Sequence, residues 1–199
     1  MRTFEFSTGS VLENKLAFIM GNSFENSALS FNSVNFIDNY ISESTIFIAN
    51  NNHITNIYNN EFVNCQTAIN GGNENDSIYI KNNRFIGGID GIDIDYSYVE
   101  INNNYFEECD VYTGSNCYGK VYNNYTTSGR IRTPGYLQVF NNVSINSNST
   151  GLIVSSMSDL CSNNIIINNL YALGSTGMLT YDNCIILNNL NLTQSSIIG

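Results

Sequence analysis

The densest group of acidic residues in the chain lies in Gly88–Asp95. Within it Asp93 and Asp95 alternate with Ile92 and Ile94. In a β-strand the isoleucines would point inward and the two carboxylates outward. Carboxylate oxygens are the hard ligands that calcium takes, so Asp93 and Asp95 are candidate calcium ligands. The plainer interpretation of the same residues is an acidic turn followed by a surface strand.

Aromatic side chains form the second group that could contact a ligand. The chain has 13 tyrosines, and many of them lie between residues 96 and 136. If isoleucine and valine fill the core, several of these rings face outward, where each offers an apolar face and a polar hydroxyl. We expect Tyr96, Tyr98, Tyr112 and Tyr136 to contact a sugar or another protein. Isolated surface tyrosines on a β-sheet, however, need no function.

A repeat of about 21 residues positions these groups. Strings such as IYNNEF, IKNNRF, INNNYF and VFNNV recur along the chain, and each contains a turn residue two positions after an apolar residue. The predicted turn residues are Gly21, Asp38, Asn59, Asn82, Asn103, Asn123, Asn141, Asn168 and Asn188. Polar and apolar residues alternate before each turn, which is a strand pattern. Three short strands per period predict one coil of a solenoid.

The 36 asparagines of the chain recur in phase with this repeat. Asparagine tolerates left-handed backbone conformations, which suits a tight bend between two short strands. In coils stacked about 4.8 Å apart, inward amides can bond to one another from coil to coil. We therefore expect a buried ladder formed by Asn59, Asn82, Asn103, Asn123 and Asn141.

The phased V/I-x-N-N-x-F/Y coils resemble the repeats of right-handed parallel β-helix proteins of the pectin-lyase-like superfamily. The resemblance covers roughly residues 17–198. That superfamily contains pectate lyases, polygalacturonases, phage tailspikes, adhesins and epimerases. The resemblance therefore implies an architecture, while the activity depends on the site.

Two strings resemble catalytic motifs of this superfamily. The string Asp90-Gly91-Ile92-Asp93 is similar to the Asn-Thr-Asp-Gly segment of polygalacturonases, which implies acid and base roles for Asp90 and Asp110. Asp93 in the same string is a further candidate catalytic residue. The string that begins with Arg132 resembles the Arg-x-Pro-x-x-Arg motif of pectate lyases, which implies that Arg132 is a base beside a calcium-bound uronate. Both motifs are incomplete, because Leu137 replaces the second arginine and there is no Gly-His-Gly.

A structural alternative exists for the arginine segment. Arg130 and Asp110 each follow a predicted turn residue, Asn123 or Asn103, by seven positions. Equivalent positions on adjacent coils lie one strand spacing apart, so the two side chains would form an ion pair on the surface.

Charge and composition exclude several classes of partner. The formal net charge is −10 and the chain has seven Lys and Arg residues, which argues against nucleic acid. No apolar stretch is long enough for membrane insertion. Of the five cysteines none forms a CxxC pair, which disfavours zinc. Cys109 and Cys117 could bridge a short loop, although buried free thiols are the simpler interpretation.

We predict an all-β, single-stranded right-handed parallel β-helix (β-solenoid) of about nine coils, with residues 1–16 as an N-terminal cap or lead-in and 17–199 as the helix. The expected function is a non-catalytic structural or adhesion module that binds glycans; the alternative is a polysaccharide lyase or glycoside hydrolase. No cofactor is expected, apart from the calcium already considered.

The expected surroundings follow from the same composition. The low charge and the Tyr- and Asn-rich surface favour an extracellular or virion location, yet the N-terminus lacks the apolar core of a signal peptide, so a cytoplasmic location stays open. Ile198 near the C-terminus is still at an inward position. We therefore expect another protein chain to cover the C-terminal coil.

Overall fold

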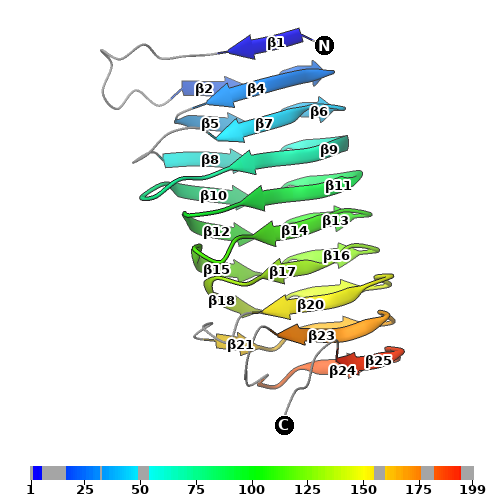
Figure 1. Cartoon of the computed structure of the whole chain (residues 1–199). Helices are drawn as coiled ribbons and strands as arrows, with labels where there is room; N and C mark the ends of the chain where they lie inside the picture. The colour runs from blue at the N-terminus through cyan, green and yellow to red at the C-terminus, as the bar shows by residue number, and fades with distance from the viewer. Residues whose placement is uncertain are drawn as a thin grey trace.

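The computed structural model describes residues 2–5, 17–31, 33–48, 54–154, 160–175 and 182–193. In these ranges the chain forms parallel strands and no helix, and the strands stack as a β-solenoid from β1 at one end to β24 and β25 at the other (Figure 1). The described part of the chain therefore contains no helix long and apolar enough to cross a membrane. The predicted all-β solenoid fold is confirmed.

One strand of each coil belongs to an eight-stranded parallel sheet. Its strands, in spatial order, are β2 (Ala17–Met20), β5 (Val34–Ile37), β8 (Ile54–Tyr58), β10 (Ser77–Lys81), β12 (Tyr98–Asn102), β15 (Tyr118–Tyr122), β18 (Tyr136–Phe140) and β21 (Leu160–Ser162). The strands pair in sequence order, so each coil rests on the one before it.

The other strands form a seventeen-stranded parallel sheet that covers the remaining faces. Each coil contributes two consecutive segments to this sheet. The strands of the first segment, one per coil, are β3 (Ser23–Glu25), β6 (Tyr40–Ser42), β9 (Glu61–Gly71), β11 (Arg84–Ile94), β13 (Tyr105–Glu107), β16 (Tyr125–Thr127), β19 (Val143–Ile145), β22 (Ile165–Ile167) and β24 (Ile185–Leu187). The strands of the second segment, again one per coil, are β1 (Arg2–Glu5), β4 (Ser27–Phe31), β7 (Thr45–Ile48), β14 (Asp110–Thr113), β17 (Ile131–Thr133), β20 (Thr150–Val154), β23 (Tyr171–Ser175) and β25 (Asn191–Thr193). In β9 and β11 one strand continues through both segments.

The strands lie in about seven turns spaced roughly 21 residues apart, which is fewer than the nine coils expected. The prediction counted one coil for each predicted turn residue. We call the turn that follows the strand of the eight-stranded sheet the first bend of a coil. Nine first bends occur in the described ranges, each at a residue with positive φ: Gly21, Asp38, Asn59, Asn82, Asn103, Asn123, Asn141, Asn163 and Asn183. Strand β1, inside the expected lead-in, pairs with β4 at the end of the larger sheet.

Inward side chains repeat in columns along the solenoid axis. Ile57, Ile80 and Ile101 follow one another on the eight-stranded sheet and are fully buried. Behind the first bend, Phe85 stacks between two further phenylalanines, Phe62 and Phe106, with centroids 4.7 Å apart and planes within 5°. This spacing equals the distance between strands, so the three identical rings stack face over face on consecutive coils.

The asparagine ladder exists, but it lies one residue later than predicted. The ladder is formed by Asn39, Asn60, Asn83, Asn104, Asn124, Asn142 and Asn164. For example, the Asn83 backbone N–H and Nδ2 donate to Asn104 Oδ1 at 2.9 and 3.1 Å. All seven side chains are buried.

The predicted ladder residues Asn59, Asn82, Asn103, Asn123 and Asn141 are the residues just before the true ladder. They are exposed and hold φ between 55° and 57°. The physical reason is the bend itself, because the left-handed residue turns its own side chain outward and directs the next one into the core. The prediction assigned the left-handed bend and the buried amide to one asparagine, whereas two neighbouring asparagines divide these properties between them.

The chain bends a second time between the two segments of the larger sheet. The predicted turn residues Asn168 and Asn188 belong to this second bend, between β22 and β23 and between β24 and β25. Register places Asn163, and not Asn168, opposite Asn141, since Phe140 pairs with Ser162. The string IINNLY therefore repeats the first-bend pattern at a different corner. With Asn163 as the bend, the interval from Asn141 is 22 residues, close to the average period, whereas the predicted bend at Asn168 gave 27. Ile166 and Ile186 consequently stack with Ser144, in the phenylalanine column.

Candidate functional site

A column of tyrosines runs along the outer face of the eight-stranded sheet. Tyr98, Tyr118 and Tyr136 are register partners on β12, β15 and β18. The Tyr98 and Tyr118 ring centroids lie 5.5 Å apart, and Tyr79 on β10 lies 6.0 Å from Tyr98. Tyr118 is 47% exposed and Tyr136 is 53% exposed. Consecutive coils therefore present aromatic rings to solvent along one line.

A second aromatic column lies four residues further along the same strands. Tyr122 stacks on Phe140 with centroids 5.0 Å apart and planes 7° apart. The Tyr122 hydroxyl donates a 2.6 Å hydrogen bond to Glu100 Oε1, and this bond raises the pKa of Tyr122 to about 12. The phenol therefore stays protonated and its ring is held in place.

Polar residues run between the two aromatic columns, because side chains alternate along each strand. Glu100, Lys120 and Gln138 are register partners there. We call the whole surface the tyrosine face; it consists of Tyr79, Tyr98, Tyr118, Tyr122, Tyr136, Phe140, Glu100, Lys120 and Gln138. It offers flat apolar rings on both sides of a row of hydrogen-bonding groups, and Tyr79, the register partner of Glu100, ends that row.

The structure brings two of the four predicted ligand-contacting tyrosines together. Tyr98 and Tyr136 lie on the tyrosine face. Tyr96 occupies the turn before β12 with φ of 57°, and Tyr112 lies on β14 in the other sheet. The remaining aromatic members were missed, although the repeat contains the signal. Tyr98, Tyr118 and Tyr136 each precede a first-bend residue by five positions.

A different aromatic row lies on the first segment of the larger sheet. Tyr105 on β13 and Tyr125 on β16 stack with centroids 5.5 Å apart and planes 4° apart. The Arg84 guanidinium lies over the Tyr105 ring at 5.7 Å and also forms a 2.6 Å ion pair with Glu61. This row already has an internal cation–π partner and lacks a second parallel column, so it serves as the comparison surface.

The candidate catalytic residues form two separate columns on the second segment of the larger sheet. Asp90 is the register partner of Asp110. Arg130 Nε contacts Asp110 Oδ2 at 2.5 Å, which confirms the predicted ion pair. Burial first, and then the neighbouring charge of Asp110, raise the pKa of Asp90. Two adjacent carboxylates with one arginine are thus the densest charge cluster among these candidates.

The other two candidates, Asp93 and Arg132, lie two coils apart. Tyr112 on β14 is the register partner of both and separates them. The Arg132 guanidinium lies 4.9 Å from the centre of the Tyr112 ring. Arg132 is therefore held against an aromatic ring, and the register places it away from the Asp90–Asp110 pair.

The candidate calcium ligands do not form a built site. Asp95 Oδ1 accepts the Tyr96 backbone N–H at 2.9 Å, and its carboxylate lies against Gly114 where a Cβ would collide. Burial and the charge of Asp95 raise the pKa of Asp93. Among the residues that the structure describes, no group of three or more His, Cys, Asp or Glu side chains could hold a metal ion. Two carboxylates alone do not fit the six to eight oxygens that calcium takes.

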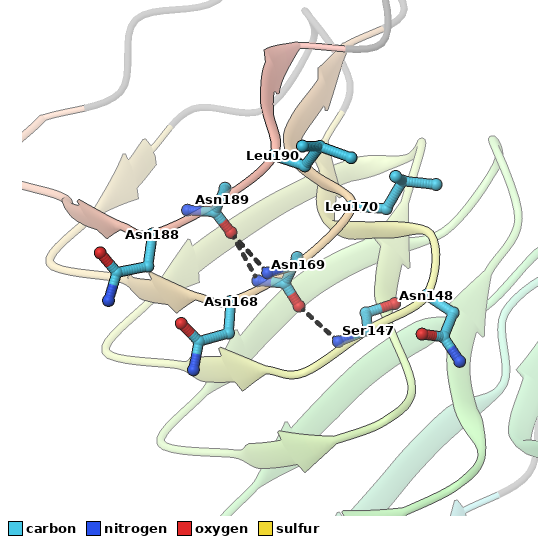
Figure 2. Close-up of a pocket in the computed structure, with 8 residues that line it drawn as sticks. All are labelled: Ser147, Asn148, Asn168, Asn169, Leu170, Asn188, Asn189 and Leu190. Carbon is cyan, nitrogen blue, oxygen red and sulfur yellow. Dashed lines mark hydrogen bonds between the residues drawn. The ribbon is translucent and has the colours of Figure 1, made fainter.

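Figure 2 shows a shallow groove at the second bend of the last three coils. Its volume is about 660 Å³, and it is lined by Ser147, Asn148, Asn168, Asn169, Leu170, Asn188, Asn189 and Leu190. Asn169 Nδ2 donates to Asn189 Oδ1 at 3.1 Å, so a second short ladder forms its floor. Amides of Asn168 and Asn188 and the 76% exposed Leu190 line its rim. None of the predicted site residues lines this groove.

Cys109 and Cys117 are buried free thiols, as the simpler interpretation of the sequence expected, and they form no bridge. They lie at opposite ends of β14, one at each bend. A four-residue strand separates them by roughly 13 Å, which is beyond disulfide reach. Burial raises the pKa of Cys109 to about 12 and that of Cys117 to about 11, so neither thiol ionises near neutral pH.

Comparison of the chain with models of known protein families, with curated proteins and with solved structures gives no match in any of the three.

Proposed function

We propose that this protein is a non-catalytic parallel β-helix module that binds glycans along its tyrosine face. The observation that carries the proposal is the pair of aromatic columns flanking Glu100, Lys120 and Gln138. A sugar ring has apolar C–H faces and equatorial hydroxyls. Aromatic rings bind the former, while carboxylate, ammonium and amide groups bind the latter.

The direction of the columns suits a linear polysaccharide that lies along the solenoid axis. The rings of Tyr98, Tyr118 and Tyr136 recur on three consecutive coils at a spacing of about 4.8 Å, on the order of one pyranose ring. The ladder and the stacked core hold this surface rigid, so little side-chain entropy is lost on binding. Membership of the pectin-lyase-like superfamily, an extracellular or virion location and a protein chain covering the C-terminal coil belong to the same proposal.

The test is affinity electrophoresis of the full chain in native gels that contain neutral or uronate polysaccharides. At least one polysaccharide should retard the protein. Tyr98→Ala, Tyr118→Ala and Tyr136→Ala should each weaken that binding by roughly 2- to 10-fold, as expected for loss of one ring contact.

The matched control is the double variant Tyr105→Ala and Tyr125→Ala on the comparison surface. It removes the same chemical groups from another face and should leave retardation unchanged. Absence of retardation in every gel, or equal loss in the control, would contradict glycan binding by the tyrosine face.

A polysaccharide lyase or glycoside hydrolase is the second candidate, favoured by the Asp90–Asp110–Arg130 cluster alone. A raised carboxyl pKa beside a second carboxylate is typical of acid–base sites. Incubation of the protein with polygalacturonate, followed by assay of reducing ends and of unsaturated uronate, tests it. Activity that Asp90→Asn abolishes would replace the non-catalytic proposal.

A further inference from the structure

Cys184 occupies the ladder position of its coil. The Ile185 backbone N–H donates to Asn164 O at 2.9 Å, just as Ile165 N–H donates to Asn142 O at 2.8 Å one coil earlier. Cys184 is therefore stacked on Asn164, where the preceding coils place asparagine. The Cys184 thiol donates to Asp182 O at 3.5 Å, the carbonyl two residues back that a ladder amide contacts.

The ladder geometry determines what a residue at this position touches in the preceding coil. Each ladder amide donates to the carbonyl of the residue three positions before the preceding ladder residue. Asn142 Nδ2 thus reaches Val121 O at 2.9 Å, and Asn164 Nδ2 reaches Val139 O at 3.1 Å. By the same rule residue 184 lies over residue 161, which is also a cysteine.

Contacts at the sulfurs agree with this placement. Asn164 Nδ2 lies 3.6 Å from Cys161 Sγ, and the interaction between the two thiols raises the pKa of Cys161 and lowers that of Cys184. Cys161 is 3% exposed, whereas Cys184 is half-buried and can be reached from solvent. The arrangement is a buried thiol beside a reachable one on adjacent coils.

We infer that Cys161 and Cys184 are an oxidation site at which a disulfide joins the last two described coils. With glutathione disulfide as the oxidant, the Cys184 thiolate attacks one glutathione sulfur, the S–S bond breaks, and one glutathione leaves as a thiol. Cys161 then attacks the Cys184 sulfur and releases the second glutathione. The two protein thiols lose two electrons and two protons, and the glutathione disulfide gains them and becomes two glutathione thiols.

The bond would cross-link two coils that otherwise depend on backbone and ladder hydrogen bonds. It closes a loop between residues 161 and 184, which restricts the unfolded chain. A loop of this size in a chain of this length should raise the melting temperature by about 5–10 °C. Oxidation would thus stabilise the C-terminal coils in an oxidising compartment.

The experiment uses the full chain, reduced, desalted and incubated with glutathione disulfide at neutral pH. Titration of free thiols after unfolding should show a fall from the five cysteines of the sequence to three. Peptide mapping without reduction should identify one cross-link, between the peptides that contain Cys161 and Cys184. The melting temperature should rise with oxidant and return with dithiothreitol.

Three variants keep the test independent of folding defects. Cys184→Ser and Cys161→Ser should fold, show no cross-link and show no change of melting temperature with oxidant. Cys117→Ser, a matched change of a buried thiol, should still form the bond. A folded wild type that gives no Cys161–Cys184 cross-link, stops at a glutathione adduct on Cys184, or forms Cys184-linked dimers instead would overturn the inference.

Discussion

At the scale of single residues, the two asparagines of each first bend have separate tasks. Asn103 holds the left-handed conformation with its side chain in solvent, and Asn104 is 2% exposed with its amide in the ladder. Asn104 Nδ2 donates to Ile80 O and to Asn124 Oδ1, both at 3.0 Å. Glycine can adopt the left-handed conformation of Asn103, but it has no side-chain amide to replace that of Asn104.

Matched glycine variants should separate these tasks. Asn104→Gly should destabilise the fold by about 1–3 kcal/mol, since it leaves buried partners in two coils without their hydrogen bonds. Asn103→Gly should change stability by less than about 0.5 kcal/mol, because glycine adopts positive φ readily. Chemical denaturation of both variants measures the difference. Equal losses would show that the ladder amide contributes nothing beyond the bend.

Neighbouring carboxylates should respond oppositely to neutralisation. The pKa of Asp90 is raised by burial and by Asp110, so its ionised form disfavours the folded state. This penalty is absent well below the ordinary aspartate pKa and complete above the raised one. Asp90→Asn should therefore raise the melting temperature slightly at about pH 7 and leave it unchanged at about pH 3.

Asp110→Asn is the contrasting variant. Asp110 accepts hydrogen bonds from the Arg130 backbone N–H at 3.0 Å and from Arg130 Nε. Its loss should lower the melting temperature at about pH 7. The same sign for both variants across this range would contradict the assignment of the ion pair to Asp110.

The Cys184 thiol should ionise at unusually low pH. The interaction with the Cys161 thiol and contacts from Asn164 outweigh burial and the charge of Asp182, and they lower the pKa of Cys184 to about 6. Its alkylation rate by iodoacetamide, followed by peptide mapping, should rise through about pH 6 and then level off. Cys161→Ser should move that rise to higher pH if the thiol contact is responsible.

At the scale of one column, the core changes character along the molecule. The stacked rings of Phe62, Phe85 and Phe106 give way to Thr126 and Ser144 at the same position of later coils. Ser144 Oγ donates to Gly151 O at 2.9 Å, whereas Thr126 Oγ1 is buried with no hydrogen-bond partner. Two polar residues thus interrupt the apolar column, and the hydroxyl of Thr126 is the unsatisfied one.

Thr126→Val should therefore stabilise the protein by about 1 kcal/mol, because valine keeps the shape and removes an unsatisfied hydroxyl. Thr133→Val is the control, since Thr133 Oγ1 donates to Ile153 O at 3.3 Å and its removal should be neutral or destabilising. Thermal melting should give a rise of about 2–4 °C for the first change. A fall in Tm for Thr126→Val would mean that the hydroxyl is satisfied in solution.

At the scale of the whole molecule, stability is a sum of coils and of the interfaces between neighbours. Deletion of Tyr105–Asn124 removes one period and lets Asn104 take the ladder place of Asn124. This variant should keep its β-sheet circular dichroism and a cooperative transition at a modestly lower temperature. Deletion of residues 105–114 removes half a period and moves inward side chains to the surface, so cooperative melting should be lost. Two folded deletion variants would contradict a register-dependent core.

The sequence alone determined the properties that belong to one coil. Alternation of Ile78 and Ile80 with Ser77 and Tyr79 specifies a strand with one buried face, and asparagine at a bend specifies left-handed backbone. Both follow from local sterics and from the two-residue period of a strand. The period of about 21 residues and the Arg130–Asp110 pair followed from them.

Only the tertiary structure decided the properties that depend on the register between coils. Which of two adjacent asparagines enters the ladder, which bend Asn168 belongs to, and which tyrosines share a face were assigned by the pairing of whole strands. The position of Cys184 over Cys161 has the same origin. A shift of one residue exchanges inward and outward side chains, and hydrogen bonds between coils, not local preference, select the register.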